Sequence, residues 1–83
     1  MTKKATELVK KYEDKLDTQK WLVDKRFNTV DESLERVRSE KEDFQNLVTS
    51  MFHYQLLNEN DFKELMTIAY KMSDTYVDKI LAI

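Results

Sequence analysis

Residues 57–62 read LNENDF, and this stretch decides the fold of the chain. Asn58 is a residue type preferred at the cap position that begins an α-helix, and Asp61 occupies the third position after it. Leu57 and Phe62 stand where two apolar side chains commonly pack together across a helix start. The stretch therefore predicts a joint in the chain that is followed at once by a helix.

Apolar residues on both sides of this joint recur at the spacing of an amphipathic helix. Only Val37 is apolar between Glu35 and Asp43, so we expect that part of the earlier helix to lie at a solvated edge. The later helix is predicted over residues 59–81, with Phe62, Leu65, Met66, Ala69, Met72, Tyr76, Val77 and Ile80 on one broad stripe. The earlier helix is predicted over about residues 30–57, with Leu34, Val37, Phe44, Val48, Met51 and Phe52 facing inward.

A first helix is predicted over residues 3–27. Thr29, with Glu32 three residues later, has the pattern of a reciprocal helix cap and places a joint before the second helix. A single uninterrupted helix is the alternative, because a seven-residue apolar repeat runs through this joint. The inward stripe of the first helix consists of Ala5, Leu8, Val9, Tyr12, Leu16, Val23 and Phe27. The repeat consists of Val9, Leu16, Val23, Val30, Val37, Phe44 and Met51.

The composition favours an all-α fold. The 83 residues include no Gly, Pro or Cys, which removes the usual residues of tight β-hairpin turns and every disulfide or thiolate site. This length suits one helical domain over residues 1–83. Short joints make consecutive helices antiparallel neighbours, so we expect an up-down-up bundle of three long amphipathic helices. A helical hairpin completed by dimerisation is the second expectation.

The charges nearly cancel over the whole chain but not within each part. There are 14 basic and 16 acidic side chains, and no stretch approaches the roughly 20 apolar residues needed to cross a bilayer. Residues 1–30 hold eight basic against five acidic side chains, and residues 31–64 hold four against nine. The first two helices are therefore electrostatic complements. Because no stretch is apolar enough to cross a bilayer, we expect a cytoplasmic protein with no membrane partner.

The residue types needed for catalysis or for metal and cofactor binding are nearly absent. His53 is the one histidine. The helical positions before it hold Thr49 and Ser50, so no carboxylate is placed to share a metal ion with it. A catalytic triad would need the same histidine, and Ser50 beside it is no signal for one. Phosphate-binding loops need glycine, and residues 58–61 lack the glycine and the final glutamate of a calcium loop. We therefore expect no enzyme activity, no cofactor and no metal.

Two charged stretches make nucleic acid an alternative partner. The first helix presents seven lysines and one arginine, but they alternate with five acidic residues, and base reading favours Arg, Asn and Gln. The second helix carries an acidic patch that would allow the protein to imitate a nucleic-acid backbone, although Arg36, Arg38 and Lys41 lie among the acids. The patch consists of Asp31, Glu32, Glu35, Glu42 and Asp43. Nucleic acid is thus a less favoured partner than protein.

Trp21 is the most informative side chain for function. At 100° per residue it points nearly opposite the inward stripe of the first helix, so a simple bundle leaves its indole in water. Tryptophan is a preferred anchor of protein interfaces, and we expect Leu22 and Phe27 nearby to extend the patch, with Lys25 beside them. Ile68 is similarly off its stripe and belongs either to the same patch or to a dimer contact. A bend at residues 17–18 that rotates Trp21 into the core is the alternative.

Two segments carry a resemblance to a known family. Residues 21–27, WLVDKRF, and residues 62–68, FKELMTI, resemble uncharacterised small helical proteins of staphylococcal phages and pathogenicity islands. The resemblance implies a small regulator or inhibitor that binds another protein in the host cytoplasm and has no catalytic residues.

These observations together predict a non-catalytic, protein-binding regulator or inhibitor encoded by a phage or mobile element. It would dock a helical face containing Trp21, Leu22, Lys25 and Ile68 on a target protein. A homo-oligomeric structural or assembly protein, whose seven-residue repeat is a self-association seam, is the alternative. A nucleic-acid-binding or nucleic-acid-mimicking protein is a further one.

Overall fold

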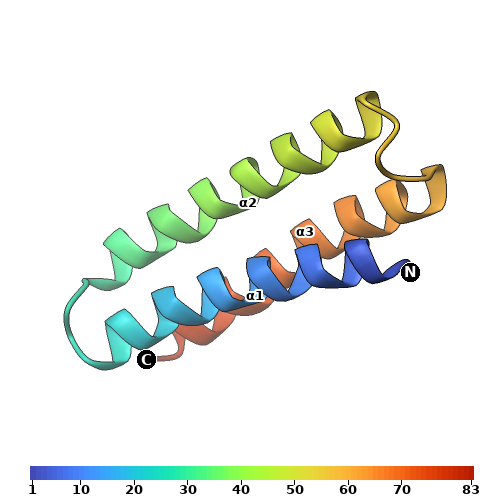
Figure 1. Cartoon of the computed structure of the whole chain (residues 1–83). Helices are drawn as coiled ribbons and strands as arrows, with labels where there is room; N and C mark the ends of the chain where they lie inside the picture. Colours follow the sequence, from blue (N-terminus) through green and yellow to red (C-terminus); the bar gives the residue numbers. More distant parts are fainter.

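The computed structural model describes all 83 residues as three α-helices that form one bundle. Helix α1 spans Lys3–Asp24, α2 spans Val30–His53 and α3 spans Glu59–Leu81. The helices run up, down and up, so the α1–α2 joint and the C-terminus lie at one end and the N-terminus and the α2–α3 joint at the other (Figure 1). The structure thus confirms the predicted all-α fold and shows a turn near Thr29 in place of a continuous helix.

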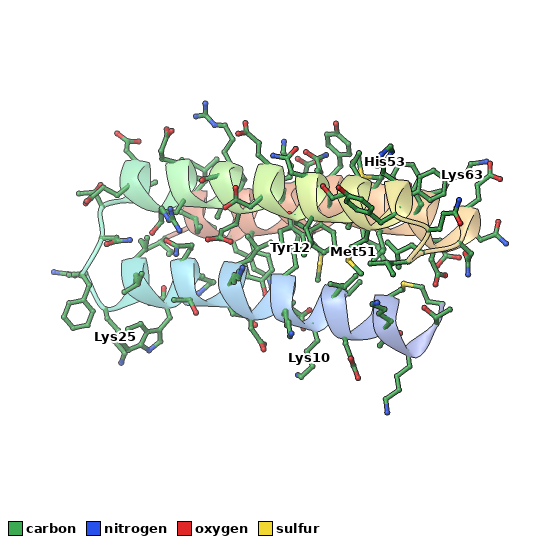
Figure 2. The ribbon with its side chains drawn as sticks, turned by 45° about the horizontal axis from the view of Figure 1, so that its top comes forward. Lys10, Tyr12, Lys25, Met51, His53 and Lys63 are labelled. Carbon is green, nitrogen blue, oxygen red and sulfur yellow. The ribbon has the colours of Figure 1, made fainter.

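One core joins all three helices within a single chain. Leu16, Leu65 and Ile80 are completely buried, and burying each such side chain contributes about 1.5–3 kcal/mol. The Tyr12 ring stacks on the Phe44 ring with centroids 4.3 Å apart. Tyr12 and Met51 point between the helices, whereas Lys10 and His53 point outward (Figure 2). None of the helices has a stretch that is both long and apolar enough to cross a bilayer.

Each helix begins at a capping side chain. The backbone N–H of Glu32 donates to the Thr29 hydroxyl at 3.1 Å, and the Thr29 N–H donates to the Glu32 carboxylate at 2.9 Å, which completes the predicted reciprocal cap. The Asp61 N–H donates to the Asn58 side chain at 2.7 Å, as the second predicted cap requires. Thr2 caps α1 in the same way. These bonds satisfy backbone N–H groups that have no partner inside the helix.

Helices α1 and α2 end three and four residues before the predicted ends at residues 27 and 57. Arg26 and Gln55 adopt left-handed backbone angles, with φ of 62° and 61°. The N–H of the next residue then returns to a carbonyl of the last helical turn, in the arrangement called a Schellman motif. Glycine usually holds this position, because other residues pay about 1–2 kcal/mol for the left-handed conformation. With no glycine in the chain, the sequence carried no signal for these two ends.

The early part of α2 is solvated on one side only. Between residues 35 and 43, Val37 is completely buried and Glu40 is 7% exposed, while five residues of the outer side are exposed, so the expected solvated edge is limited to that outer side. The reason is that polar side chains from α1 and α2 pack against one another there. The prediction that Phe27 lies on the inward stripe was also wrong, because α1 ends at Asp24 and leaves that ring 70% exposed.

Candidate functional site

Trp21 lies on the outer face of α1 near its C-terminal end. Its side chain is 51% exposed because the buried residues of α1, such as Leu16 and Val23, occupy the opposite face. The helix runs without interruption through residues 17–18, so no bend rotates the indole into the core. The structure therefore decides between the two sequence interpretations in favour of an exposed tryptophan.

Phe27 is held against Trp21 by the end of α1. The Phe27 N–H donates to the Leu22 carbonyl at 2.8 Å, which turns the chain back over the last helical turn. The two rings lie 5.7 Å apart, centre to centre, at 34°. Leu22 beside them is half-buried and Lys25 is exposed; Figure 2 places Lys25 at this turn. We call Trp21, Leu22, Lys25 and Phe27 the first-joint surface.

Ile68 does not belong to this surface. Helices α1 and α3 run in the same direction, with Thr2 bonded to Asp61 at one end and Asp17 to Tyr76 near the other. Ile68 is therefore level with the early part of α1, about 18 Å along the bundle from Trp21 at 1.5 Å per helical residue. It is half-buried on α3 beside Lys71, so the expected single patch that includes Ile68 is not formed.

The interior beside the first-joint surface is polar. The Asn28 side-chain amide donates to the Ser33 hydroxyl at 3.3 Å, and that hydroxyl donates to the Gln19 backbone carbonyl at 3.0 Å. Gln19 is only 8% exposed. Its side-chain oxygen is buried and accepts no hydrogen bond. A hollow of about 410 Å³ opens at this place between α1 and α2, and it is lined by Gln19, Leu22, Asn28, Glu32, Glu35 and Arg36.

The sequence contains a signal for the α1 side of this polar cluster. Gln19 falls between Leu16 and Val23 at the three- and four-residue spacings of the inward stripe. A polar residue at such a position must either find partners in the core or remain unsatisfied. The cluster was thus detectable on α1, but its partner Ser33 was not, because it comes from a different helix.

The predicted acidic patch is exposed along the outer side of α2. Arg38 lies 3.4 Å from Glu35, and the Glu32 pKa is lowered because the Thr29 N–H and hydroxyl bond its carboxylate. Glu40, which continues this acidic run, is instead buried and lies 2.8 Å from Arg36 and 3.8 Å from Lys15. The patch is therefore a surface of mixed charge. The exposed acids are Asp31, Glu32, Glu35, Glu42 and Asp43.

The basic side chains of α1 are partly used within the bundle. Lys20 pairs with Asp24 at 2.7 Å, and Lys15 with Glu40 is the one ion pair that joins α1 to α2. Only one ion pair therefore contributes directly to the predicted electrostatic attraction between α1 and α2; the rest of that attraction comes from their opposite net charges. Six cations of this region form no ion pair, namely Lys3, Lys4, Lys10, Lys11, Lys25 and Arg26.

The remaining titratable groups have structural surroundings. The Tyr12 hydroxyl donates to the Ala69 carbonyl at 2.9 Å, and burial together with nearby Glu40 raises the Tyr12 pKa to about 12. The Tyr76 hydroxyl donates to Asp17, and burial together with this bond raises the Tyr76 pKa well above its ordinary value. His53 is exposed beside the Tyr54 ring. No group of three or more histidine, aspartate or glutamate side chains is placed to hold a metal ion.

Comparison with known proteins supplies no relative. No protein-family model, no curated protein and no solved structure matches this chain.

Proposed function

We propose that this protein is a non-catalytic binding module that docks its first-joint surface on a target protein, as a regulator or inhibitor of the kind that phages and mobile elements encode. The observation that carries the proposal is the pair of exposed rings of Trp21 and Phe27, which lie in contact at a tilted angle. Tryptophan and other large aromatic side chains supply most of the binding energy in many interfaces when a partner covers them.

The backbone of the surface is hydrogen-bonded before any partner arrives. Trp21 lies on a regular helix, and the Phe27 backbone is bonded to Leu22 in the helix-ending motif. Binding then costs little ordering of the backbone, so more of the contact energy remains as affinity. Lys25, exposed and without an ion pair, adds a charge at the rim of the surface.

A purely local role does not account for two large rings. Schellman motifs are commonly accompanied by an apolar contact across the turn, and Trp21 with Phe27 occupies that position. The α2–α3 joint forms the same motif with the Leu56 N–H bonded to the Met51 carbonyl, and it has no such aromatic pair. The motif therefore forms without an exposed tryptophan, which supports a further role for Trp21.

The test is affinity capture from Gram-positive lysates, phage-infected and uninfected, with the wild type and Trp21→Ala. The matched control is Tyr54→Ala, because Tyr54 is an aromatic residue at the opposite end and is 73% exposed. We expect a protein that the wild type and Tyr54→Ala retain and that Trp21→Ala loses. Equal capture by all three variants would show that the first-joint surface is not the docking site.

Self-assembly is the second candidate. Exposed apolar side chains occur at both ends of the bundle, with Leu81 and Ile83 near the first joint and Leu56 and Tyr54 at the second. End-to-end association would cover them. Light scattering at high micromolar concentration tests this: a mass above one chain supports self-assembly, and a mass of one chain at every concentration eliminates it.

A further inference from the structure

The last part of α2 and the second joint form a surface without charge. Residues 44–58 contain no Asp, Glu, Lys or Arg, in a chain of which 36% is charged. Most of these residues are nevertheless exposed. They lie at the same end of the bundle as the N-terminal half of α1 (Figure 1). Since an amphipathic helix normally carries charge on its solvent side, this part of α2 has a face that lacks a partner.

Two large apolar side chains stand on the side of α2 that faces α1. Glu40 marks that side, because its carboxylate lies 3.8 Å from Lys15 of α1. Leu47 and Tyr54 follow Glu40 by about two and about four helical turns and therefore share its side. They are 48% and 73% exposed, whereas Met51 between them is half-buried against the core. This side of α2 thus ends in an uncovered apolar stripe.

Two lysines of α1 lie along this stripe. Lys4 and Lys11 precede Lys15 by about three turns and about one turn, so they stand on the side of α1 that faces α2. Both are exposed and neither forms an ion pair. At 1.5 Å per residue, Lys11 and Lys4 are about 6 and 16 Å beyond the Lys15 ion pair toward the second joint. Leu47 and Tyr54 are about 10 and 21 Å beyond it, so cations and apolar side chains alternate along one seam.

The charges around this seam favour an acidic partner. Its cations outnumber its acids by two, in a chain whose net charge is −2. The cations are Lys3, Lys4, Lys10 and Lys11, and the acids are Glu7 and Asp43. The acids at this end of α3 have neighbours of their own, in the pairs Glu59–Lys63 and Asp61–Thr2 and in the group of Glu64 with Lys71. They leave the positive excess on the seam between α1 and α2.

We infer that this seam binds an acidic amphipathic helix of another protein, whose apolar residues cover Leu47 and Tyr54 and whose carboxylates meet Lys4 and Lys11. We call these four residues the seam surface. Seven residues separate Leu47 from Tyr54, and seven separate Lys4 from Lys11. This interval is about two helical turns, so one straight helix along the seam presents matching residues to both pairs. The partner would lie there as a fourth helix of the bundle.

The seam surface fits this partner better than other anionic ones. A nucleic-acid backbone offers phosphates but no apolar counterpart for Leu47. A second copy of this chain offers the acids of α2, but residues 31–43 expose no large apolar side chain among them. Trp21 lies beyond Lys15 in the opposite direction along α1, so the seam surface and the first-joint surface are separate. The inference therefore goes beyond the proposed docking function and does not depend on it.

The probe is a synthetic helical peptide of about 18 residues, with leucines along one face and glutamates beside them. A matched peptide has glutamine in place of every glutamate. NMR of the whole protein follows the backbone amides of the seam surface as each peptide is added. We expect saturable shifts from the acidic peptide with a dissociation constant on the order of 100 µM, and roughly fivefold weaker binding of the neutral peptide.

Trp21 is the one tryptophan of the chain, so its indole N–H signal reports the first-joint surface alone. That signal should not move when the acidic peptide binds. Equal affinity for the two peptides would show that charge plays no part. Shifts at the Trp21 indole in place of Leu47 and Tyr54 would put the contact elsewhere. Either result overturns the inference.

Two pairs of variants locate the contact. Leu47→Gln removes an exposed apolar group and keeps a good helix former, so the chain should stay folded while the peptide binds roughly tenfold more weakly. Leu81→Gln makes the same change at a 61% exposed position of α3 and should bind normally. Lys11→Gln should weaken binding roughly threefold and reduce its salt dependence, whereas Lys71→Gln on α3 should do neither. Unchanged binding by Leu47→Gln would overturn the seam surface.

Other occupants give different results. Shifts of the Leu47 and Tyr54 amides on dilution of the protein alone would assign the face to a second copy of the chain. A DNA duplex that displaces the peptide and binds Leu47→Gln as tightly as the wild type would assign the lysines to nucleic acid. Both results overturn the helical partner. Trp21→Ala should bind the acidic peptide normally, so failure of the seam surface and failure of the first-joint surface are observed separately.

Discussion

The two joints of the bundle have the same backbone and opposite side-chain chemistry. Each has a left-handed residue, Arg26 or Gln55, followed three residues later by the cap of the next helix, Thr29 or Asn58. The residue just before the cap differs. Leu57 is 7% exposed in the core at the second joint, whereas Asn28 bonds to Ser33 at the first. Turn geometry is thus independent of what the turn buries.

This difference separates the ends of the bundle by role. At the second joint Phe62 packs against the core and stacks on Phe52 with centroids 4.4 Å apart, although Phe52, which was predicted to face inward, is 37% exposed. At the first joint the rings of Trp21 and Phe27 are outside and the interior holds Gln19 and Ser33. An end that keeps its polar groups inside and its rings outside gives up apolar burial, which supports a binding role for it.

The largest effect is expected from giving the second joint the residue of the first. Leu57→Asn removes a buried apolar side chain and leaves an amide without partners, so it should lower the free energy of unfolding by about 2–4 kcal/mol. Urea unfolding followed by circular dichroism measures it. The reciprocal Asn28→Leu is the control and should change stability by less than about 1 kcal/mol. Similar losses from both would show that the joints do not differ in kind.

A smaller loss is expected from breaking the polar cluster. Ser33→Ala removes the donor to the Gln19 carbonyl and the acceptor of the Asn28 amide, and should cost about 1–2 kcal/mol. The same urea titration applies. Ser50→Ala, at an exposed position of the same helix, should have little effect. A cost for Ser33→Ala no larger than that for Ser50→Ala would mean that the cluster contributes no stability.

The common backbone of the joints predicts a matched gain. Arg26→Gly and Gln55→Gly relieve the left-handed conformation, and each should raise the free energy of unfolding by about 0.5–1 kcal/mol after the entropy cost of glycine. Thermal unfolding of both variants checks it. Lys25→Gly, at a residue with right-handed angles, is the control and should destabilise. A gain at one joint alone would show that the two joints also differ in the energetic cost of their left-handed residue.

The smallest expected effect is a pH dependence at the second-joint end. The Thr2 hydroxyl and N–H donate to Asp61 at 2.6 and 3.1 Å, and these bonds hold the Asp61 pKa below its ordinary value. The unfolded chain therefore binds a proton more readily than the folded chain, so the stabilisation is present at neutral pH and is lost as the pH falls through the folded pKa.

Thr2→Val should reduce this acid sensitivity, measured as the change in urea midpoint between about pH 6 and pH 3. The corresponding group at the first joint is Glu32, whose pKa is lowered by Thr29, and Thr29→Val is the matched variant. If Thr2→Val keeps the full slope of the wild type, the Thr2–Asp61 bonds do not set it.

Helix starts were predictable because their chemistry is local. Thr29 and Asn58 cap residues only three positions away, so the pattern of side chains along the chain contains the whole interaction. The helix ends were not predictable to the residue, since Arg26 and Gln55 take a conformation that their own side chains do not favour. Packing and returning hydrogen bonds impose it.

The candidate site divides in the same way. The direction of Trp21 followed from helical geometry, because a residue opposite a strong apolar stripe faces away from the core in any bundle of this helix. The separation of Ile68 from Trp21 did not follow, since it depends on how α3 is set against α1.

The amino-acid order alone predicted the amphipathic helices and the second joint, since periodicity and capping act within a few residues. It left a continuous helix at Thr29 and a bend before Trp21 as alternatives, and the structure excludes both. Only tertiary packing determined that Ser33 of α2 meets Gln19 of α1, that Phe27 folds back on Trp21, and that the Gln19 oxygen is left without a donor beside a hollow. Those contacts join residues on different elements, and their energies depend on distances that exist only once the helices are packed.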